Sequence, residues 1–98
     1  MAIAMFMEWN GVTAEQYDAV RKKVKWETDV PEGAIFHVAA LSDKGLHVTD
    51  LWASAEDFQN FVEKRLMPGV KEVVGDIDEP HVEVYPVYAL FTPKFKPI

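Results

Sequence analysis

His37 and Asp50 are the two residues of this chain whose types best suit acid–base chemistry. An imidazole exchanges a proton near neutral pH, and a carboxylate beside it fixes the ring tautomer and stabilises the imidazolium cation. The pair is useful only if folding brings the two side chains together. His37 lies in the apolar segment 34–41 and Asp50 in the segment 46–52, and the turn sequence SDKG at 42–45 joins the two segments.

These two segments predict the strands of an antiparallel hairpin. SDKG suits a type I turn with Gly45 in the left-handed bulge position. Counting back from this turn predicts four opposed pairs: Leu41 with Leu46, Ala39 with Val48, His37 with Asp50, and Ile35 with Trp52. Opposed Cβ atoms lie about 5 Å apart, and residues two apart in a strand share a face. The side chains of His37, Asp50 and Trp52 should therefore converge on one face of the sheet.

Two interpretations of this convergence follow from the sequence. In the first, His37 is a general base that Asp50 orients, and the substrate is a small, mostly apolar molecule, with aromatic molecules among the candidates. Four further residues would then line an apolar pocket with few polar groups, the usual form of a small-molecule site: Trp52, Trp9, Met7 and Tyr17. In the second, the pair is a structural cross-strand hydrogen bond that satisfies two buried polar groups, and Trp52 belongs to the core.

Two further apolar segments predict the remaining strands. Residues 2–9, AIAMFMEW, precede the turn signal Asn10-Gly11 and predict the first strand. Residues 81–91, HVEVYPVYALF, predict the last strand. Pro86 has no N–H to donate to a neighbouring strand, so the last strand should lie at an edge of the sheet.

Capping signals predict two helices. Thr13 followed by Gln16 fits a capping box, in which each side chain bonds the backbone N–H of the other residue. Ser54 is the expected cap of a second helix, which should end at Pro68-Gly69 before a further helical turn in VKEVV. Apolar residues at helical spacing predict the buried side of each helix: Tyr17, Val20 and Val24 in the first, and Phe58, Phe61, Val62 and Leu66 in the second.

The predicted order is β-α-β-β-α-β within a single domain, residues 1–98. This is the ferredoxin-like α+β arrangement, a four-stranded antiparallel sheet with both helices on one face. The strand at 34–41 carries apolar residues on both faces, but the helices cover only one of them. We therefore expect a homodimer through the open sheet face, with Phe95 of the C-terminal tail as a candidate contact with the partner.

The composition excludes several functional classes. A net charge of -6 argues against nucleic acid and anionic membranes as partners, because both require Lys or Arg to neutralise phosphate. The absence of cysteine removes disulfides, thiolate zinc sites and Cys nucleophiles, and it is compatible with a cytoplasmic location. The three His show no metal-ligand spacing, so we expect no metal site. The start, MAIAMFMEW, is too short for a signal peptide or a spanning helix.

The segment VTDLWASAEDFQNFVEKRL, together with the element order, resembles the dimeric α+β barrel superfamily of antibiotic-biosynthesis-monooxygenase-like proteins. In that group the third strand commonly ends in an acidic residue, one spacer and a Trp, followed by a small polar residue that starts the second helix. Asp50, Trp52 and Ser54 occupy these positions here. The resemblance implies sheets that pack into a dimeric barrel and a ligand pocket between sheet and helices, which the strand-three Trp faces.

Members of this superfamily include cofactor-free monooxygenases, haem-degrading enzymes and isomerases. The haem-binding members take their iron ligand from a His on a helix, and neither predicted helix of this chain contains a His. We therefore expect no haem and no other cofactor.

Three functional hypotheses follow. The first is a small cytoplasmic homodimer that binds a small organic molecule between sheet and helices, with cofactor-independent monooxygenase-like or acid–base chemistry at His37 and Asp50. The second is a non-enzymatic ligand-binding or protein-association module of the same fold, in which the His37/Asp50 pair is structural. The third is a subunit that acts only beside a partner protein.

Overall fold

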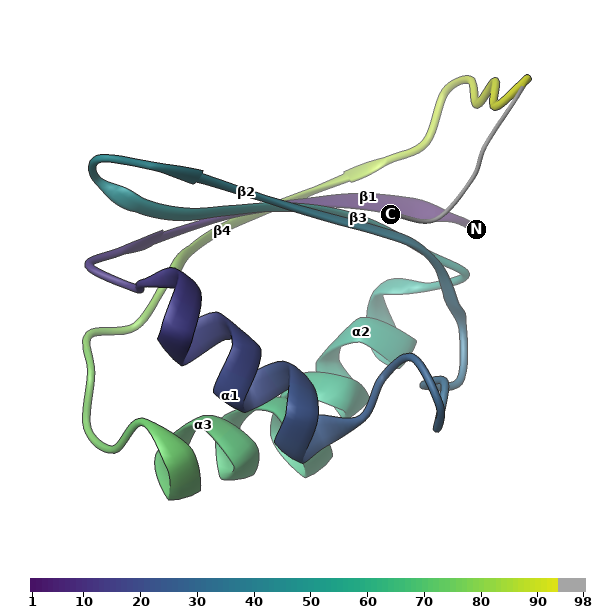
Figure 1. Cartoon of the computed structure of the whole chain (residues 1–98). Helices are drawn as coiled ribbons and strands as arrows, with labels where there is room; N and C mark the ends of the chain where they lie inside the picture. Colours follow the sequence, from purple (N-terminus) through teal and green to yellow (C-terminus); the bar gives the residue numbers. More distant parts are fainter. Residues whose placement is uncertain (94–98) are drawn as a thin grey trace.

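The computed structural model describes residues 1–93 and shows two layers, a sheet and a group of helices against one sheet face (Figure 1). The sheet is antiparallel with strand order β2-β3-β1-β4, and its strands are β1 (Ile3–Asn10), β2 (Ala34–Ser42), β3 (Gly45–Trp52) and β4 (His81–Pro86). The helical layer contains α1 (Ala14–Val24) and a longer helix built from α2 (Ala55–Phe61), η1 (Val62–Leu66) and α3 (Met67–Val73). This order confirms the predicted ferredoxin-like α+β fold.

The hairpin of β2 and β3 has the predicted register over most of its length. Ser42 lies opposite Gly45 at the turn, and Gly45 has the positive φ, 136°, that favours glycine. A Cβ atom at this position would also lie 2.4 Å from the backbone oxygen of Trp9, so a larger residue would collide with β1. His37 lies opposite Asp50, as predicted. The turn therefore sets the strand pairing that places His37 beside Asp50.

The register prediction is wrong at the start of β2. Trp52 lies opposite Ala34 and not opposite Ile35, because an irregularity between Ala34 and Phe36 shifts the pairing by one residue. The N–H of Ala34 bonds to the carbonyl oxygen of Pro31 at 3.1 Å, which holds the strand at this start. Ile35 is consequently half exposed.

The first helix, α1, begins at the predicted capping box. The Thr13 hydroxyl accepts the Gln16 N–H at 3.2 Å, and the Gln16 side-chain oxygen accepts the Thr13 N–H at 3.0 Å. The helix ends at Lys25, whose φ of 60° is left-handed and whose N–H bonds to the oxygen of Arg21. Both ends of α1 are therefore set by local hydrogen bonds.

The second helix does not end at Pro68-Gly69 as predicted. Ser54 caps it as expected, by accepting a first-turn N–H at 3.1 Å, but the helix then continues through η1 and α3. In the π-helical turn η1, the Met67 N–H bonds to the oxygen of Val62, five residues back. Pro68 has no N–H and its ring collides with a regular α-helical turn, so the wider turn before it lets the helix continue past it.

The last strand, β4, is shorter than predicted. It ends at Pro86 and pairs only with β1, so it is an edge strand, as the proline indicated. The N–H of Val87 still bonds to the oxygen of Ala2 at 3.0 Å, and beyond this point the chain leaves the sheet (Figure 1). Phe95, the expected contact with a partner, lies outside the described residues.

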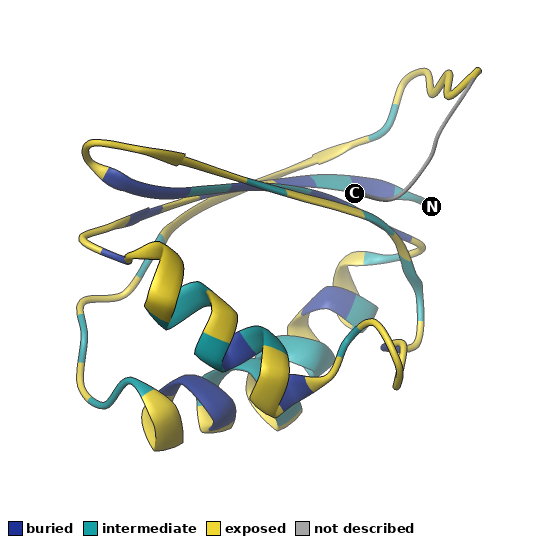
Figure 2. Cartoon of the chain, in the orientation of Figure 1, coloured by how far each residue is buried: buried dark blue, intermediate teal, exposed yellow. Residues whose placement is uncertain are grey.

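The hydrophobic core lies between the sheet and the helices (Figure 2). Every second residue of β1 is buried there, and Met5 is the most deeply buried of all, with 1% exposed. The core residues are Ile3, Met5, Met7, Trp9, Val12, Val20, Val24, Leu46, Val48, Trp52, Phe58 and Val70. No helix within residues 1–93 is long and apolar enough to cross a membrane.

The contact between α1 and α3 gives the first testable prediction. A Cβ atom on Gly69 would lie 2.7 Å from Cγ2 of Val24, a buried and β-branched residue that has little freedom to move. We expect Gly69→Ala to lower the free energy of unfolding, because an overpacking cost of about 1–3 kcal/mol exceeds the helix-propensity gain of about 1 kcal/mol. Urea unfolding measures the change in the free energy of unfolding. Lys71→Ala, at an exposed position in the same helix, is the control. A stabilised Gly69→Ala would contradict this packing.

Candidate functional site

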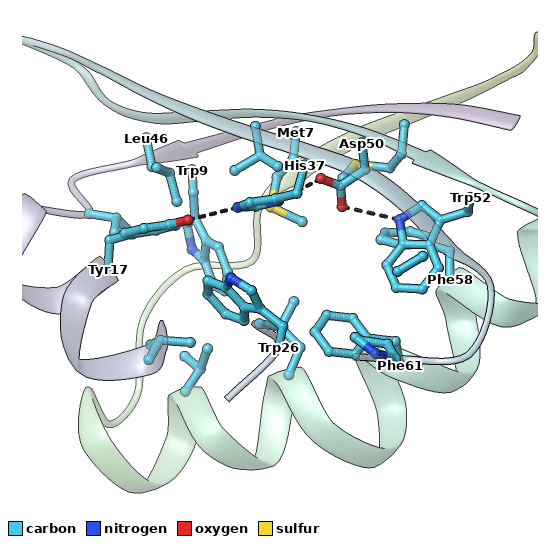
Figure 3. Close-up of a pocket in the computed structure, with 18 of the residues that line it drawn as sticks. Met7, Trp9, Tyr17, Trp26, His37, Leu46, Asp50, Trp52, Phe58 and Phe61 are labelled. Carbon is cyan, nitrogen blue, oxygen red and sulfur yellow. Dashed lines mark hydrogen bonds and ion pairs between the residues drawn. The ribbon is translucent and has the colours of Figure 1, made fainter. Parts of the chain in front are cut away.

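A cavity of about 240 Å³ lies between the sheet and the helices (Figure 3). Its walls are almost entirely apolar and come from strands β1, β2 and β3, both helices and the loops that join them. All the residues that the sequence analysis assigned to a pocket line this cavity: Met7, Trp9, Tyr17, His37, Asp50 and Trp52. The structure brings these six side chains together, and their functional roles stay a prediction.

Strand alternation explains why five of the six meet. Met7 and Trp9 belong to the buried set of alternate residues in β1. Asp50 and Trp52 occupy the equivalent buried positions in β3. His37 joins them because the hairpin register sets it opposite Asp50. The sixth residue comes from α1, which lies against this face of the sheet.

Four side chains form a continuous hydrogen-bonded chain along one wall of the cavity (Figure 3). Trp52 donates from its indole Nε1 to Oδ2 of Asp50 at 3.1 Å. His37 Nδ1 lies 2.6 Å from Asp50 Oδ1. His37 Nε2 lies 2.7 Å from the Tyr17 hydroxyl oxygen. The sequence predicted the contact between the histidine and the aspartate, but not the hydrogen bonds at the two ends of the chain.

The hydrogen-bond partners assign the protons in this chain. An indole N–H only donates, so Asp50 Oδ2 accepts from Trp52, and the other carboxylate oxygen accepts from His37 Nδ1–H. A neutral imidazole then has an unprotonated Nε2, which accepts the Tyr17 O–H. The Asp50 side chain is 8% exposed and that of His37 is 34% exposed. The chain therefore runs from a buried carboxylate to a ring at the cavity mouth.

Aromatic contacts hold Tyr17 in position. Its ring centroid lies 5.6 Å from that of Trp26 and 6.1 Å from that of His37. Burial is the main cause that raises the pKa of Tyr17 to about 12, and the nearby Arg21 cation opposes this shift. The phenol is therefore neutral near pH 7, and it both donates and accepts a hydrogen bond.

Four aromatic residues of the cavity are missing from the sequence-based site: Trp26, Phe36, Phe58 and Phe61. Phe58 and Phe61 were assigned only to a buried helix face, and in the structure their ring centroids lie 5.7 Å and 5.3 Å from that of Trp52. Trp26 lies in the loop after α1. A single Trp in the charged stretch KKVKWETD is the signal that identifies it, because a large aromatic there needs a place to be buried.

Asp50 is the only Asp or Glu, among residues 1–93, that lines the cavity. No Lys or Arg of this part of the chain lines the cavity. No three of its His, Asp and Glu side chains come together in a way that would hold a metal ion. A buried anionic ligand would therefore meet a negative charge without a compensating cation, which is costly in an apolar site.

Several solved protein structures have a fold similar to that of this chain. No family model and no curated protein matches the chain. A protein of unknown function from Nitrosomonas europaea is structurally similar with a TM-score of 0.70 at 15% sequence identity, over 95% of each chain. SnoaB, a cofactor-independent oxygenase from Streptomyces nogalater, has a TM-score of 0.61 at 8% identity, over 95% of this chain and 97% of its own. A monooxygenase from Streptomyces coelicolor, solved with the ligand nanaomycin D, has a TM-score of 0.59 at 16% identity, over 95% of this chain and 92% of its own.

This chain has the fold of the antibiotic-biosynthesis-monooxygenase-like proteins. At these identities the likeness shows the fold alone, and it is the fold that the resemblance of the sequence implied. A hydroxynitrile lyase from Passiflora edulis shares the fold too, with a TM-score of 0.58 at 13% identity, over 93% of this chain and 97% of its own. Because one fold serves such different proteins, the function has to be argued from the cavity of this chain.

The raised pKa of Tyr17 predicts how stability changes with pH. Between pH 10, the ordinary tyrosine pKa, and about pH 12, the unfolded chain loses the Tyr17 proton while the folded chain keeps it. The unfolded state then binds fewer protons, so the free energy of unfolding falls as pH rises through this window. Urea unfolding at a series of pH values measures the fall. It should be smaller in Tyr17→Phe and unchanged in Tyr88→Phe, where the side chain is exposed; an equal fall in both variants would contradict the assignment.

Proposed function

We propose that this chain binds a small, neutral, mostly apolar organic molecule in the cavity and catalyses a cofactor-independent reaction that starts with removal of a proton. The observation that carries this proposal is the hydrogen-bonded chain through His37 and Asp50 on the wall of an otherwise apolar cavity. A few polar groups that converge in an apolar pocket are the usual form of a small-molecule site. The proposal includes the cytoplasmic location expected from the sequence.

The cavity volume sets the size of the ligand. An engineered apolar cavity of about 150 Å³ binds benzene, and this cavity has about 240 Å³. A ligand of one ring with substituents, or of two fused rings, fits this space. The aromatic walls favour a planar molecule, because aromatic pairs contribute beyond their buried area.

The histidine and the aspartate supply the acid–base chemistry. When His37 accepts a proton, its cation lies 2.6 Å from the buried Asp50 carboxylate, and a low-dielectric site strengthens that attraction. The substrate is left as a carbanion or enolate. In a monooxygenase-like reaction this anion reacts with dioxygen, so that a CH₂ group and O₂ become a carbonyl group and water. The likeness to a cofactor-independent oxygenase supports this reaction class.

One observation favours a second function, that of a binding protein without catalysis. Both imidazole nitrogens of His37 already have partners within the chain, so the pair is also a well-satisfied structural element. In this case the same cavity holds a ligand without changing it. The two functions share the ligand and differ only in turnover, so one experiment separates them.

The probe 2-tetralone, a neutral two-ring ketone with acidic C–H groups, tests both functions. All three tryptophans of the chain line the cavity, so their fluorescence reports binding. Deuterium exchange of the probe in D₂O reports proton removal, and an oxygen electrode reports reaction with dioxygen. We expect His37→Gln to slow exchange at least ~100-fold and to change Kd only a few-fold, while the matched control His47→Gln changes neither. Exchange that is unaffected by His37→Gln would refute the catalytic proposal, and binding without exchange would support the binding protein.

We also propose that two copies associate through the open sheet face, as the sequence suggested. Phe6, Val38 and Tyr85 are 44%, 46% and 51% exposed. The Phe6 and Tyr85 ring centroids lie 6.1 Å apart, so these side chains form a patch across β1 and β4. An exposed apolar patch of this kind marks an association surface, and packing against the same face of a second copy would bury it.

Light scattering at micromolar concentration tests the association. We expect the wild type to have twice the chain mass of 11.1 kDa. Phe6→Glu should be monomeric, because the new carboxylate would be buried in the interface without a partner. Val73→Glu places the same charge on α3, away from the sheet, and should stay dimeric. A monomeric wild type would overturn the proposal.

A further inference from the structure

We infer that Tyr17 is a catalytic residue: its hydroxyl takes the proton of the substrate while it passes its own proton to His37. The inference rests on the proposed function and gives His37 a different position in it. The histidine becomes the final acceptor of the proton and does not touch the substrate. The hydrogen-bonded chain then works as a relay from the cavity to His37, whose cation the buried carboxylate of Asp50 stabilises.

The geometry of His37 carries this inference. Its Nδ1 lies 2.6 Å from Asp50 and its Nε2 lies 2.7 Å from the Tyr17 hydroxyl, so neither nitrogen is free for a substrate. A substrate that reached Nε2 directly would first have to displace Tyr17. That residue is anchored on α1 and packed against Trp26, with ring centroids 5.6 Å apart. Displacement would therefore break packing as well as a hydrogen bond.

The Tyr17 hydroxyl can accept a further hydrogen bond, whereas both nitrogens of the His37 imidazole already have partners. A phenol donates one hydrogen bond and accepts others, and the O–H of Tyr17 is already directed to His37. Its oxygen lone pairs remain as acceptors, and Tyr17 lines the cavity. The Tyr17 oxygen is therefore a polar atom at this end of the chain that can accept a hydrogen bond from a bound ligand.

The transfer is balanced in atoms and in charge. The substrate O–H or C–H bond breaks and its proton forms a new O–H bond on Tyr17, while the original Tyr17 O–H bond breaks and its proton forms an N–H bond on His37 Nε2. The substrate becomes an anion and the imidazole becomes a cation. The net charge of the site stays at that of the Asp50 carboxylate, which avoids the cost of adding charge to an apolar cavity.

The relay also removes an objection to Tyr17 as an acid–base group. Burial raises the pKa of its phenol, so a tyrosinate is unfavourable in this position. In the relay the tyrosine gains one proton as it loses another, and no tyrosinate accumulates. The group that changes charge is the imidazole, whose cation Asp50 stabilises.

The probe 4-nitrophenol tests the relay without knowledge of the natural substrate. It is a neutral one-ring phenol with an acidity close to that of an imidazolium, and its phenolate has a separate visible absorption band. Tryptophan fluorescence measures binding, and the visible band measures ionisation of the bound probe at a pH below the pKa of the free probe. The variants are Tyr17→Phe and His37→Gln. Tyr88→Phe removes the hydroxyl of an exposed tyrosine that does not line the cavity, and is the matched control.

We expect the probe bound to the wild type to show the phenolate band. Tyr17→Phe should reduce the ratio of bound phenolate to bound phenol about tenfold or more, which is one unit in the apparent pKa of the bound probe, while its Kd changes only a few-fold. His37→Gln should have the same effect and Tyr88→Phe none. A phenolate band that persists in Tyr17→Phe would overturn the relay, because His37 would then take the proton directly. A bound probe that stays neutral in the wild type would overturn it too.

A crystal structure of the wild type with 4-nitrophenol gives a second test that requires no variant to fold. The relay requires the probe oxygen within hydrogen-bond distance of the Tyr17 hydroxyl, with the contact between Tyr17 and His37 intact. A probe oxygen on His37 Nε2, with the tyrosine displaced, would overturn the relay and leave the proposed function standing. Failure of all neutral one-ring and two-ring probes to bind would instead overturn the proposed function itself.

Discussion

The buried carboxylate of Asp50 is the constraint on which the rest of the site depends. The Asp50 side chain is 8% exposed, and an isolated charge at that depth would cost several kcal/mol. Two N–H groups offset this cost, one from Trp52 on the same strand and one from His37 on the neighbouring strand. The second donor is available only in one register of the hairpin, because a slip of one residue would turn His37 to the opposite face. The fold and the site therefore require the same strand pairing.

The structural and the catalytic interpretations of the pair depend on the same contacts. A hydrogen bond that satisfies a buried carboxylate also fixes the tautomer of an imidazole and prepares it to accept a proton. At the other end of the ring, Tyr17 bonds to Nε2. In a structural pair this contact satisfies the second imidazole nitrogen. In a proton path it connects the imidazole to the cavity.

The two faces of the sheet carry different proposed properties. The helix-covered face holds the cavity and the hydrogen-bonded chain, and its apolar walls strengthen electrostatic interactions by excluding water. The open face carries exposed aromatic side chains on β1 and β4 and no titrating group of the site. Strand alternation separates these sets of residues completely. Association and ligand binding can therefore be changed independently by substitutions one residue apart in the same strand, such as at Phe6 and Met7.

Local patterns in the sequence determined the element order, the capping box at Thr13 and the edge position of the strand with Pro86. They also determined the contact of His37 with Asp50. Each of these features depends on residues close in the chain or on a single tight turn. The tertiary structure alone decided the irregularity that set Ala34 opposite Trp52, the passage of the helix beyond Pro68, and the positions of Tyr17 and Trp26 beside His37. Periodicity predicts which side of a helix or strand is buried. It does not predict the angle and offset at which the helices lie on the sheet, and that packing brings together side chains from separate elements, such as Tyr17 and His37.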